Sequence, residues 1–281
     1  MILITGANGR VGSWTVRTLL MHSQRVRILA RSPEKAEELA ALGAEIIRGD
    51  LADRSSIASA LEGVDRALLV IGNGPQQFEL ESRFIQAATG LKQVVKISSM
   101  EASPDTESPI PKSHYMSECL LKEQLPGWTV LRPNFFMQNL LMSARSIAQH
   151  HTFSLPFGKA RAAPIDTRDV AEIAAKTLMD ESHLGQCYEL TGPRLLNFAE
   201  IATRMSNTLG YPVQYVDQSP EDFRAFLTAV IPNAWQVNAV CDLFAQIANH
   251  ALEHVSDDAP RLLGRPQRSL EQFLLDHAKA F

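Results

Sequence analysis

Residues 1–12 of the chain, Met-Ile-Leu-Ile-Thr-Gly-Ala-Asn-Gly-Arg-Val-Gly, decide its fold. The apolar residues 2–4 are typical of a buried strand, and three glycines follow at intervals of three before a helical pattern begins. Gly6 lets the strand turn tightly, Gly9 lets backbone approach a pyrophosphate, and Gly12 lets helix and strand pack closely. This arrangement is the fingerprint of a dinucleotide-binding βαβ unit.

The start of the predicted helix supplies free amides and a positive dipole end, which favour phosphate binding. A glycine-rich turn that binds no ligand is the alternative, and its place directly after the first strand argues against it. The loop residues predicted to contact the dinucleotide are Gly6, Asn8, Gly9, Arg10, Val11 and Gly12.

Short β-branched runs alternate with longer amphipathic segments over the first half of the chain, as in parallel sheets with crossover helices. We therefore expect an α/β fold with a doubly wound parallel Rossmann sheet. The predicted strands are Ile2 to Thr5, Val26 to Ala30, Glu45 to Arg48, Ala67 to Ile71, Gln93 to Ile97 and Thr129 to Arg132. The predicted helices between them are Val11 to Met21, Pro33 to Leu42 with Ser32 as its cap, Ser55 to Leu61, Gln77 to Ala88 and Ser113 to Gln124.

The alternation loosens from Asn134 onward. We expect a single NAD(P)-binding domain over residues 1–281, with a Rossmann core in 1–133. Residues 134–281 are expected to form a smaller, mostly helical lobe that binds substrate and returns some elements to the sheet. The pattern predicts a loop over Ile147 to Pro164, helices over Thr167 to Met179, Asn197 to Leu209, Glu221 to Ala229 and Asn233 to His254, and a strand over Cys187 to Leu190.

The end of the second predicted strand indicates which cofactor binds. An acidic residue there would bond the ribose hydroxyls of NAD and repel a further phosphate. This strand instead ends at Arg31, with Lys35 one turn into the next helix. Arginine offers a planar donor fork suited to phosphate, and Lys35 and Arg10 add positive charge. The sequence predicts NADP(H), with NAD(H) less favoured, unless Arg31 is simply a solvated surface residue.

The ends of later strands carry further candidate cofactor contacts. Asp50 and Leu51 follow the third strand, where a polar and an apolar group hold adenine, although Asp50 or Asp53 can also cap the next helix. Gly72 follows the fourth strand and lets backbone run beside the cofactor. Ser98 and Pro133, after the fifth and sixth strands, complete this set.

Composition and charge exclude several classes of protein. A net charge of −4 gives no basic face for nucleic acid. The three cysteines, Cys119, Cys187 and Cys241, are too few and scattered for a disulfide framework or a zinc site, and we expect all three to be buried. No apolar run approaches the ~20 residues that span a bilayer. We expect a cytoplasmic monomer or homodimer that binds no metal, membrane or nucleic acid.

The glycine spacing, Asp50-Leu51, Ile97-Ser98-Ser99, Leu131-Arg132-Pro133 and the segment 166–170 together resemble the atypical short-chain dehydrogenases/reductases. More narrowly, the chain resembles the NmrA-like branch over nearly its whole length. That branch contains NADPH-dependent quinone reductases, triphenylmethane-dye reductases and catalytically silent NADP sensors. The resemblance implies the Rossmann fold and the cofactor.

The resemblance also implies a catalytic tyrosine four residues before a lysine, and the sequence departs from that pattern. Tyr115 is followed at this spacing by Cys119. Aligning Glu118 with the glutamate that commonly follows the motif places His114 at the lysine position. His114 and Tyr115 are therefore the catalytic candidates, and His114 either donates a proton, holds the nicotinamide ribose or is merely structural.

Residues 133–139, Pro-Asn-Phe-Phe-Met-Gln-Asn, follow the sixth strand and are expected to lie over the nicotinamide. Aromatic rings there form an apolar slot for a flat acceptor, although one of the two is expected to be ordinary core. Ser99 is placed to bond the substrate or the nicotinamide. The predicted substrate contacts are Ser99, Asn134, Phe135, Phe136 and Asn139.

Two functions fit these residues. The first is an NADPH-dependent reductase that transfers hydride to a quinone or a similar conjugated acceptor, which needs little acid–base help because the charge formed is delocalised. The second is a silent NADP(H) sensor that docks a protein partner. An open apolar pocket over the nicotinamide indicates the enzyme, and the apolar stripe of the last long helix either covers that pocket or meets a partner.

Overall fold

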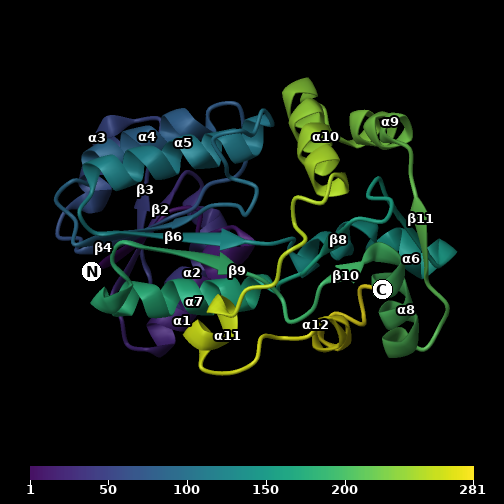
Figure 1. The fold of residues 1–281 in the computed structure, drawn as a ribbon. Helices are drawn as coiled ribbons and strands as arrows, with labels where there is room; N and C mark the ends of the chain where they lie inside the picture. Colours follow the sequence, from purple (N-terminus) through teal and green to yellow (C-terminus); the bar gives the residue numbers. More distant parts are fainter.

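The computed structural model describes all residues 1–281 and shows a seven-stranded parallel sheet with helices on both faces (Figure 1). The strand order, β3-β2-β1-β4-β5-β6-β9, reverses its direction of travel beside β1, which confirms the doubly wound Rossmann fold. The strands are β1 (Ile2–Ile4), β2 (Val26–Ala30), β3 (Glu45–Arg48), β4 (Arg66–Leu69), β5 (Gln93–Ile97), β6 (Trp128–Pro133) and β9 (Gln186–Leu190).

Alternate side chains of each strand enter two apolar layers. Ile2 and Ile4 of β1 pack on one face of the sheet, and Leu3 packs on the other. Both faces are therefore buried, which explains the continuous apolar runs in the sequence. The first face is covered by α1 (Arg10–Met21), α7 (Thr167–Met179) and α11 (Asp258–Leu263), and the second by α3 (Arg54–Leu61), α4 (Gln77–Ala87) and α5 (Pro109–Gln124).

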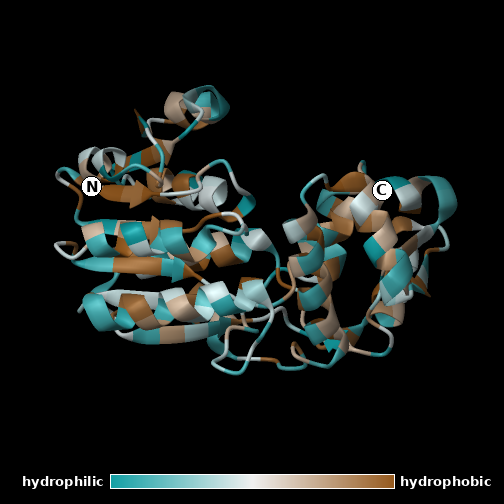
Figure 2. Ribbon diagram, turned by 90° about the horizontal axis from the view of Figure 1, so that it is seen from above, coloured by the Kyte–Doolittle hydropathy of each residue, from teal (hydrophilic) through white to brown (hydrophobic).

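The C-terminal half forms a second body with its own apolar cluster beside the carboxyl ends of the sheet strands (Figures 1 and 2). The chain leaves the sheet after β6, returns through α7 and β9, and leaves again. This body contains the helices η2 (Met137–Ser143), α6 (Ala144–His150), α8 (Phe198–Leu209), α9 (Pro220–Val230), α10 (Ala234–Ala248) and α12 (Leu270–Asp276).

Several predicted boundaries are wrong. The segment predicted as a loop over Ile147 to Pro164 contains β7 (Thr152–Leu155) and β8 (Arg161–Ala162). Their partners are β11 (Gln214–Asp217) and β10 (Leu196–Asn197). Strands this short, whose partners lie 34 or more positions away, leave no periodic pattern to detect.

Two predicted helices also differ. The segment from Pro33 is a short 3₁₀ helix, η1 (Pro33–Ala36), followed by α2 (Glu37–Ala41), and the Ser32 side chain does not cap it. The helix predicted to reach His254 ends at Ala248, because His250 adopts a left-handed conformation. His250 and His254 are therefore not one helical turn apart.

The cysteine prediction is wrong as well. Cys119 and Cys187 are exposed, and Cys241 is partly exposed. Cys119 lies on the outer side of α5, and Cys187 lies on β9, the edge strand of the sheet. No group of three or more metal-ligating side chains is placed to hold an ion, and no helix has the length and apolar character needed to cross a bilayer.

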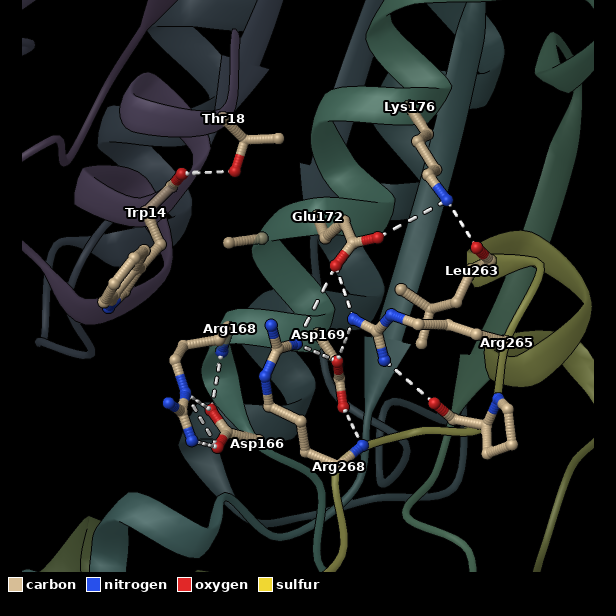
Figure 3. A network of polar contacts seen from close by, with 12 residues as sticks. Trp14, Thr18, Asp166, Arg168, Asp169, Glu172, Lys176, Leu263, Arg265 and Arg268 are labelled. Atoms are coloured by element: carbon tan, nitrogen blue, oxygen red, sulfur yellow. Dashed lines mark hydrogen bonds and ion pairs between the residues drawn. The ribbon is translucent and has the colours of Figure 1, made fainter. Parts of the chain in front are cut away.

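A buried carboxylate fastens the C-terminal segment to the sheet layer (Figure 3). Asp169 of α7 is fully buried and accepts hydrogen bonds from the Arg268 backbone amide (2.7 Å) and from the guanidinium groups of Arg265 and Arg268. Glu172, one turn further along α7, joins Arg265. The network therefore sets the path of the chain between α11 and α12.

We expect Asp169→Ala to lower the free energy of unfolding by about 2–3 kcal/mol, because it leaves two arginines and a backbone amide without their shared acceptor. Urea denaturation measures the change. Glu38→Gln is the matched control, since it removes the exposed Arg17–Glu38 ion pair and is expected to cost less than about 0.5 kcal/mol. Equal effects of the two substitutions would contradict this role of Asp169.

Candidate active site

The glycine loop occupies the point where the strand order reverses. Gly6 has φ +59°, and a Cβ there would lie 2.3 Å from the carbonyl oxygen of Val70 at the end of β4. A Cβ on Gly12 would lie 2.3 Å from the carbonyl oxygen of Gly6. The Thr5 hydroxyl accepts a hydrogen bond from the Val70 amide at 2.9 Å and ties the two strand ends together. The predicted tight turn at Gly6 and close packing at Gly12 are both present.

Two cavities meet at this point, sharing Gly6, Ile71, Gly72 and Asn73. The outer cavity, about 560 Å³, runs along the carboxyl ends of β2 and β3, and the inner one, about 480 Å³, along those of β5 and β6. Together they form a continuous groove across the sheet edge, where ligands of open α/β folds bind.

The outer cavity brings together Arg31, Lys35, Asp50 and Leu51. Arg31 and Lys35 are both exposed to the groove. Asp50 accepts a hydrogen bond from the Ala52 amide at 2.9 Å, whereas Asp53 caps α3 through the amides of Ser55 and Ser56. Asp50 therefore remains at the groove rather than at a helix end.

The inner cavity is lined by most of the other predicted residues. Arg10 lines this cavity, at the glycine-loop end, whereas Arg31 lines the outer one. Three apolar side chains of α10, Leu243, Phe244 and Ile247, close the far side. The predicted residues on its wall are Gly6, Gly9, Arg10, Val11, Gly12, Gly72, Ser98, Ser99, His114, Pro133, Asn134, Phe135, Phe136 and Asn139, while Asn8 lies in the outer cavity.

His114 lies on the cavity wall in front of a buried ion pair. The Lys96 ammonium is fully buried, 2.7 Å from Glu81 Oε1 and 3.3 Å from His114 Nδ1. The Gln77 side-chain amide lies within 3.3 Å of both ring nitrogens. Burial and the Lys96 charge hold the pKa of His114 well below its usual value, so the ring is neutral. Since Lys96 donates to Nδ1, the ring hydrogen belongs on Nε2.

Ser98 is anchored from behind the wall in a similar way. Its hydroxyl donates to Glu118 Oε1 at 2.6 Å, and Glu118 receives a two-pronged contact from Arg132 at 2.9 and 2.6 Å. These contacts and the Lys122 charge lower the pKa of Glu118 against the opposing effect of its burial. Glu118 is therefore an ionised support for the β5 end and does not line the cavity.

Asn134 and Phe135 line the cavity and also make contacts that hold the surrounding structure together. The Asn134 side-chain oxygen accepts from the amides of Phe135 and Ala163, and its nitrogen donates to the Leu252 carbonyl oxygen. The Asn134 amide is thus occupied by hydrogen bonds within the protein, whereas the Asn139 side chain makes none. Phe135 packs edge-on against Phe157 in the core of the C-terminal body, as expected for one of the two phenylalanines.

Tyr115, the other catalytic candidate, does not line either cavity. A hydrogen bond with Cys119 raises the pKa of its phenol. The helix therefore presents His114 to the groove and turns Tyr115 away from it.

Two charged residues of the site, Lys96 and Glu101, are not among the predicted site residues. Lys96 interrupts an apolar strand run, Val94-Val95-Lys96-Ile97, and a charge within a buried strand is the signal that could have found it. Glu101 lines the inner cavity, three residues after Ser98, and accepts a hydrogen bond from the Ser99 hydroxyl. No periodic pattern marks a residue in such a turn.

A sequence profile of the NmrA-like family matches residues 1–274. The chain belongs to this family. It is 35% identical over 285 residues to the NAD(P)H azoreductase of Xenophilus azovorans, an alignment that covers 100% of this chain and 99% of that protein.

Two solved structures of the same architecture extend the comparison. The NADPH-dependent quinone oxidoreductase of Escherichia coli, crystallised with NADPH, superposes with a TM-score of 0.89 at 26% identity and covers 98% of this chain and 99% of its own. The triphenylmethane reductase of Citrobacter sp., complexed with NADP(H), gives a TM-score of 0.88 at 21% identity with the same coverage and shows the fold alone.

The buried, neutral His114 makes stability depend on pH. Since its folded pKa is depressed, the unfolded chain binds more protons as pH falls below the ordinary histidine value of 6.5. Unfolding free energy should therefore fall with pH below that value, and less steeply in His114→Gln. Urea denaturation from pH 7.5 to 5 measures the difference, with the exposed His22→Gln as control. Parallel curves for wild type and His114→Gln would contradict the assignment.

Proposed function

We propose that this NmrA-like protein is an NADPH-dependent reductase that transfers hydride to quinones, azo compounds or similar conjugated small molecules. The observation that carries the proposal is the continuous groove. Its outer part offers cationic side chains, its middle a glycine loop at a helix start, and its inner part an open apolar cavity.

The residues present fit a dinucleotide phosphate. Substitution of Gly6 or Gly12 by any residue with a Cβ would close the backbone approach on which the loop depends. Arg31 and Lys35 are placed to bind a phosphate on the adenosine ribose, and Asp50 with Leu51 to hold the adenine. NADPH supplies the hydride when bound, and the chain's own residues orient it and the acceptor.

The inner cavity fits a flat acceptor. Phe136, Leu243 and Phe244 provide apolar walls, whereas Ser99 and Asn139 offer hydrogen bonds. His114, fixed by Lys96 at Nδ1, is proposed to hold the nicotinamide ribose through Nε2–H. The names of the azoreductase and quinone oxidoreductase relatives support this class of acceptor.

The alternative, a silent regulatory protein, is less well supported. A sensor can fill the acceptor cavity with its own side chains, whereas this cavity is open at about 480 Å³. Leu243 and Phe244 of α10 line the cavity and are thus committed to covering it rather than to meeting a partner.

The direct test is NADPH absorbance decay with purified protein and a panel of quinones, azo dyes and triphenylmethane dyes, with NADH alongside. Saturable turnover that prefers NADPH is the expected result. NADPH that binds, as seen by fluorescence, but is never oxidised with any acceptor would contradict the reductase and favour the sensor.

We expect Arg31→Glu to lower kcat/KM for NADPH by about tenfold or more, because a charged hydrogen bond to phosphate is replaced by repulsion, and to leave NADH nearly unaffected. Initial rates with each cofactor measure the ratio. Arg25→Glu is the matched control, since it makes the same charge change on an exposed residue at the opposite end of β2. An unchanged NADPH preference in Arg31→Glu would exclude Arg31 from phosphate binding.

A further inference from the structure

Glu101 places a carboxyl group on the wall of the acceptor cavity. It lies in the turn after β5, and the same wall also contains Ser99, Pro133 and Asn139. The Ser99 hydroxyl donates to Glu101 Oε2, so this pair forms one unit directed at the cavity. The residue as a whole is partly exposed.

No cation neutralises this carboxyl. The other titratable side chains on the wall are Arg10, at the glycine-loop end, and His114, which is neutral. Lys96 lies behind His114 in its pair with Glu81, and α10 presents only Leu243, Phe244 and Ile247 to the cavity. Desolvation therefore raises the pKa of Glu101, against the opposing effect of the Ser99 hydrogen bond. The protonated acid persists above the usual carboxyl range.

His114 is a poorer source of a proton than Glu101. Its ring is neutral, and Lys96 occupies Nδ1, so loss of the remaining Nε2 hydrogen would leave an anionic ring. A carboxylic acid, by contrast, gives its proton readily to an oxygen or nitrogen anion, since even a phenol ionises only near pH ~10.

Resting on the proposed function, we propose that Glu101 is the catalytic proton donor of this site, which makes the cavity one for neutral acceptors that take up a hydride and a proton together. In an azo compound the hydride adds to one nitrogen and the N=N π bond opens. The electron pair left on the second nitrogen takes the Glu101 proton, giving an N–H bond and a carboxylate. Water then returns a proton to Glu101, and the same step converts a quinone into a hydroquinone.

A cationic triphenylmethane dye separates proton donation from every other role of Glu101. Its central carbon takes up hydride and becomes neutral, so this reduction needs no proton. A variant without the acidic proton should therefore lose azo reduction and keep dye reduction. A variant with a damaged cavity should lose both.

The experiment compares wild type with Glu101→Gln, using 4-aminoazobenzene, menadione and crystal violet as acceptors over a range of pH. We expect Glu101→Gln to lower kcat for the azo dye by about 100-fold or more and to leave crystal violet within about twofold. The wild-type azo rate should be level at low pH and fall as pH rises through the raised pKa of Glu101, and this fall should be absent in Glu101→Gln. Glu107→Gln, an exposed residue after the same strand, is the matched control and should behave as wild type.

Equal losses for the azo dye and crystal violet would overturn the proposal, as would an unchanged azo rate in Glu101→Gln. If the wild type reduces crystal violet but neither neutral acceptor, the proposal for Glu101 is overturned, whereas the proposed reductase function stands. A wild type that oxidises NADPH with no acceptor would instead refute the proposed function.

The protonation state of Glu101 can also be measured without turnover, which tests the proposal even if no acceptor is reduced. The infrared carboxylic C=O stretch of the unliganded protein, recorded just above the ordinary glutamate value of pH 4.5, should be present in wild type and Glu107→Gln and reduced in Glu101→Gln. Its absence from wild type would overturn the protonated state on which the proposal depends.

Discussion

The close approach of β1, β4 and α1 at the glycine loop is the constraint on which the rest of the structure depends. Gly6 and Gly12 bring three backbone segments within distances that leave no room for a Cβ, and Thr5 bonds the ends of β1 and β4. Because the strand order reverses here, the crossover helices diverge to opposite faces and leave a groove above the carboxyl ends. The backbones of β1, β4 and α1 are in close contact at the glycine loop, and the two cavities lie beyond it, at the carboxyl ends of the strands.

Two polar groups of the inner cavity, His114 and Ser98, are held in place by charged residues behind the wall. His114 accepts a hydrogen bond from Lys96, which is paired with Glu81. The Ser98 hydroxyl donates to Glu118, which is paired with Arg132. Buried charges of this kind contribute little net stability, because desolvation offsets their attraction. Their value lies in fixed orientation, since a ring or hydroxyl with a charged partner has one favoured hydrogen-bond direction. Glu101 differs, because its hydrogen-bond partner on the wall, the Ser99 hydroxyl, is neutral.

The sequence was sufficient for the sheet and the outer groove. The strand over 26–30 matches β2, and Gly6, Arg31 and Asp50 lie where strand ends must converge, because their positions follow from local periodicity and parallel topology. The short strands β7 and β11 could not be predicted, since only long-range pairing defines them. Glu101 was missed for a related reason: whether a turn residue faces solvent or a cavity depends on α10, more than 130 positions later.

The two halves of the groove differ in whether they depend on α10. The outer half is lined by the glycine loop, the ends of β2 and β3 and the segment after β4, all within the first 80 residues. The inner half is closed by α10, which packs on α9 through Phe223, Leu227 and Val237 and meets the loop before α5 through a Gln246–Thr106 hydrogen bond of 2.6 Å. Because Leu243 and Phe244 belong to neither apolar layer of the sheet, their side chains can change size with little effect on the Rossmann core. The cavity can thus be fitted to different acceptors while the dinucleotide groove stays as it is.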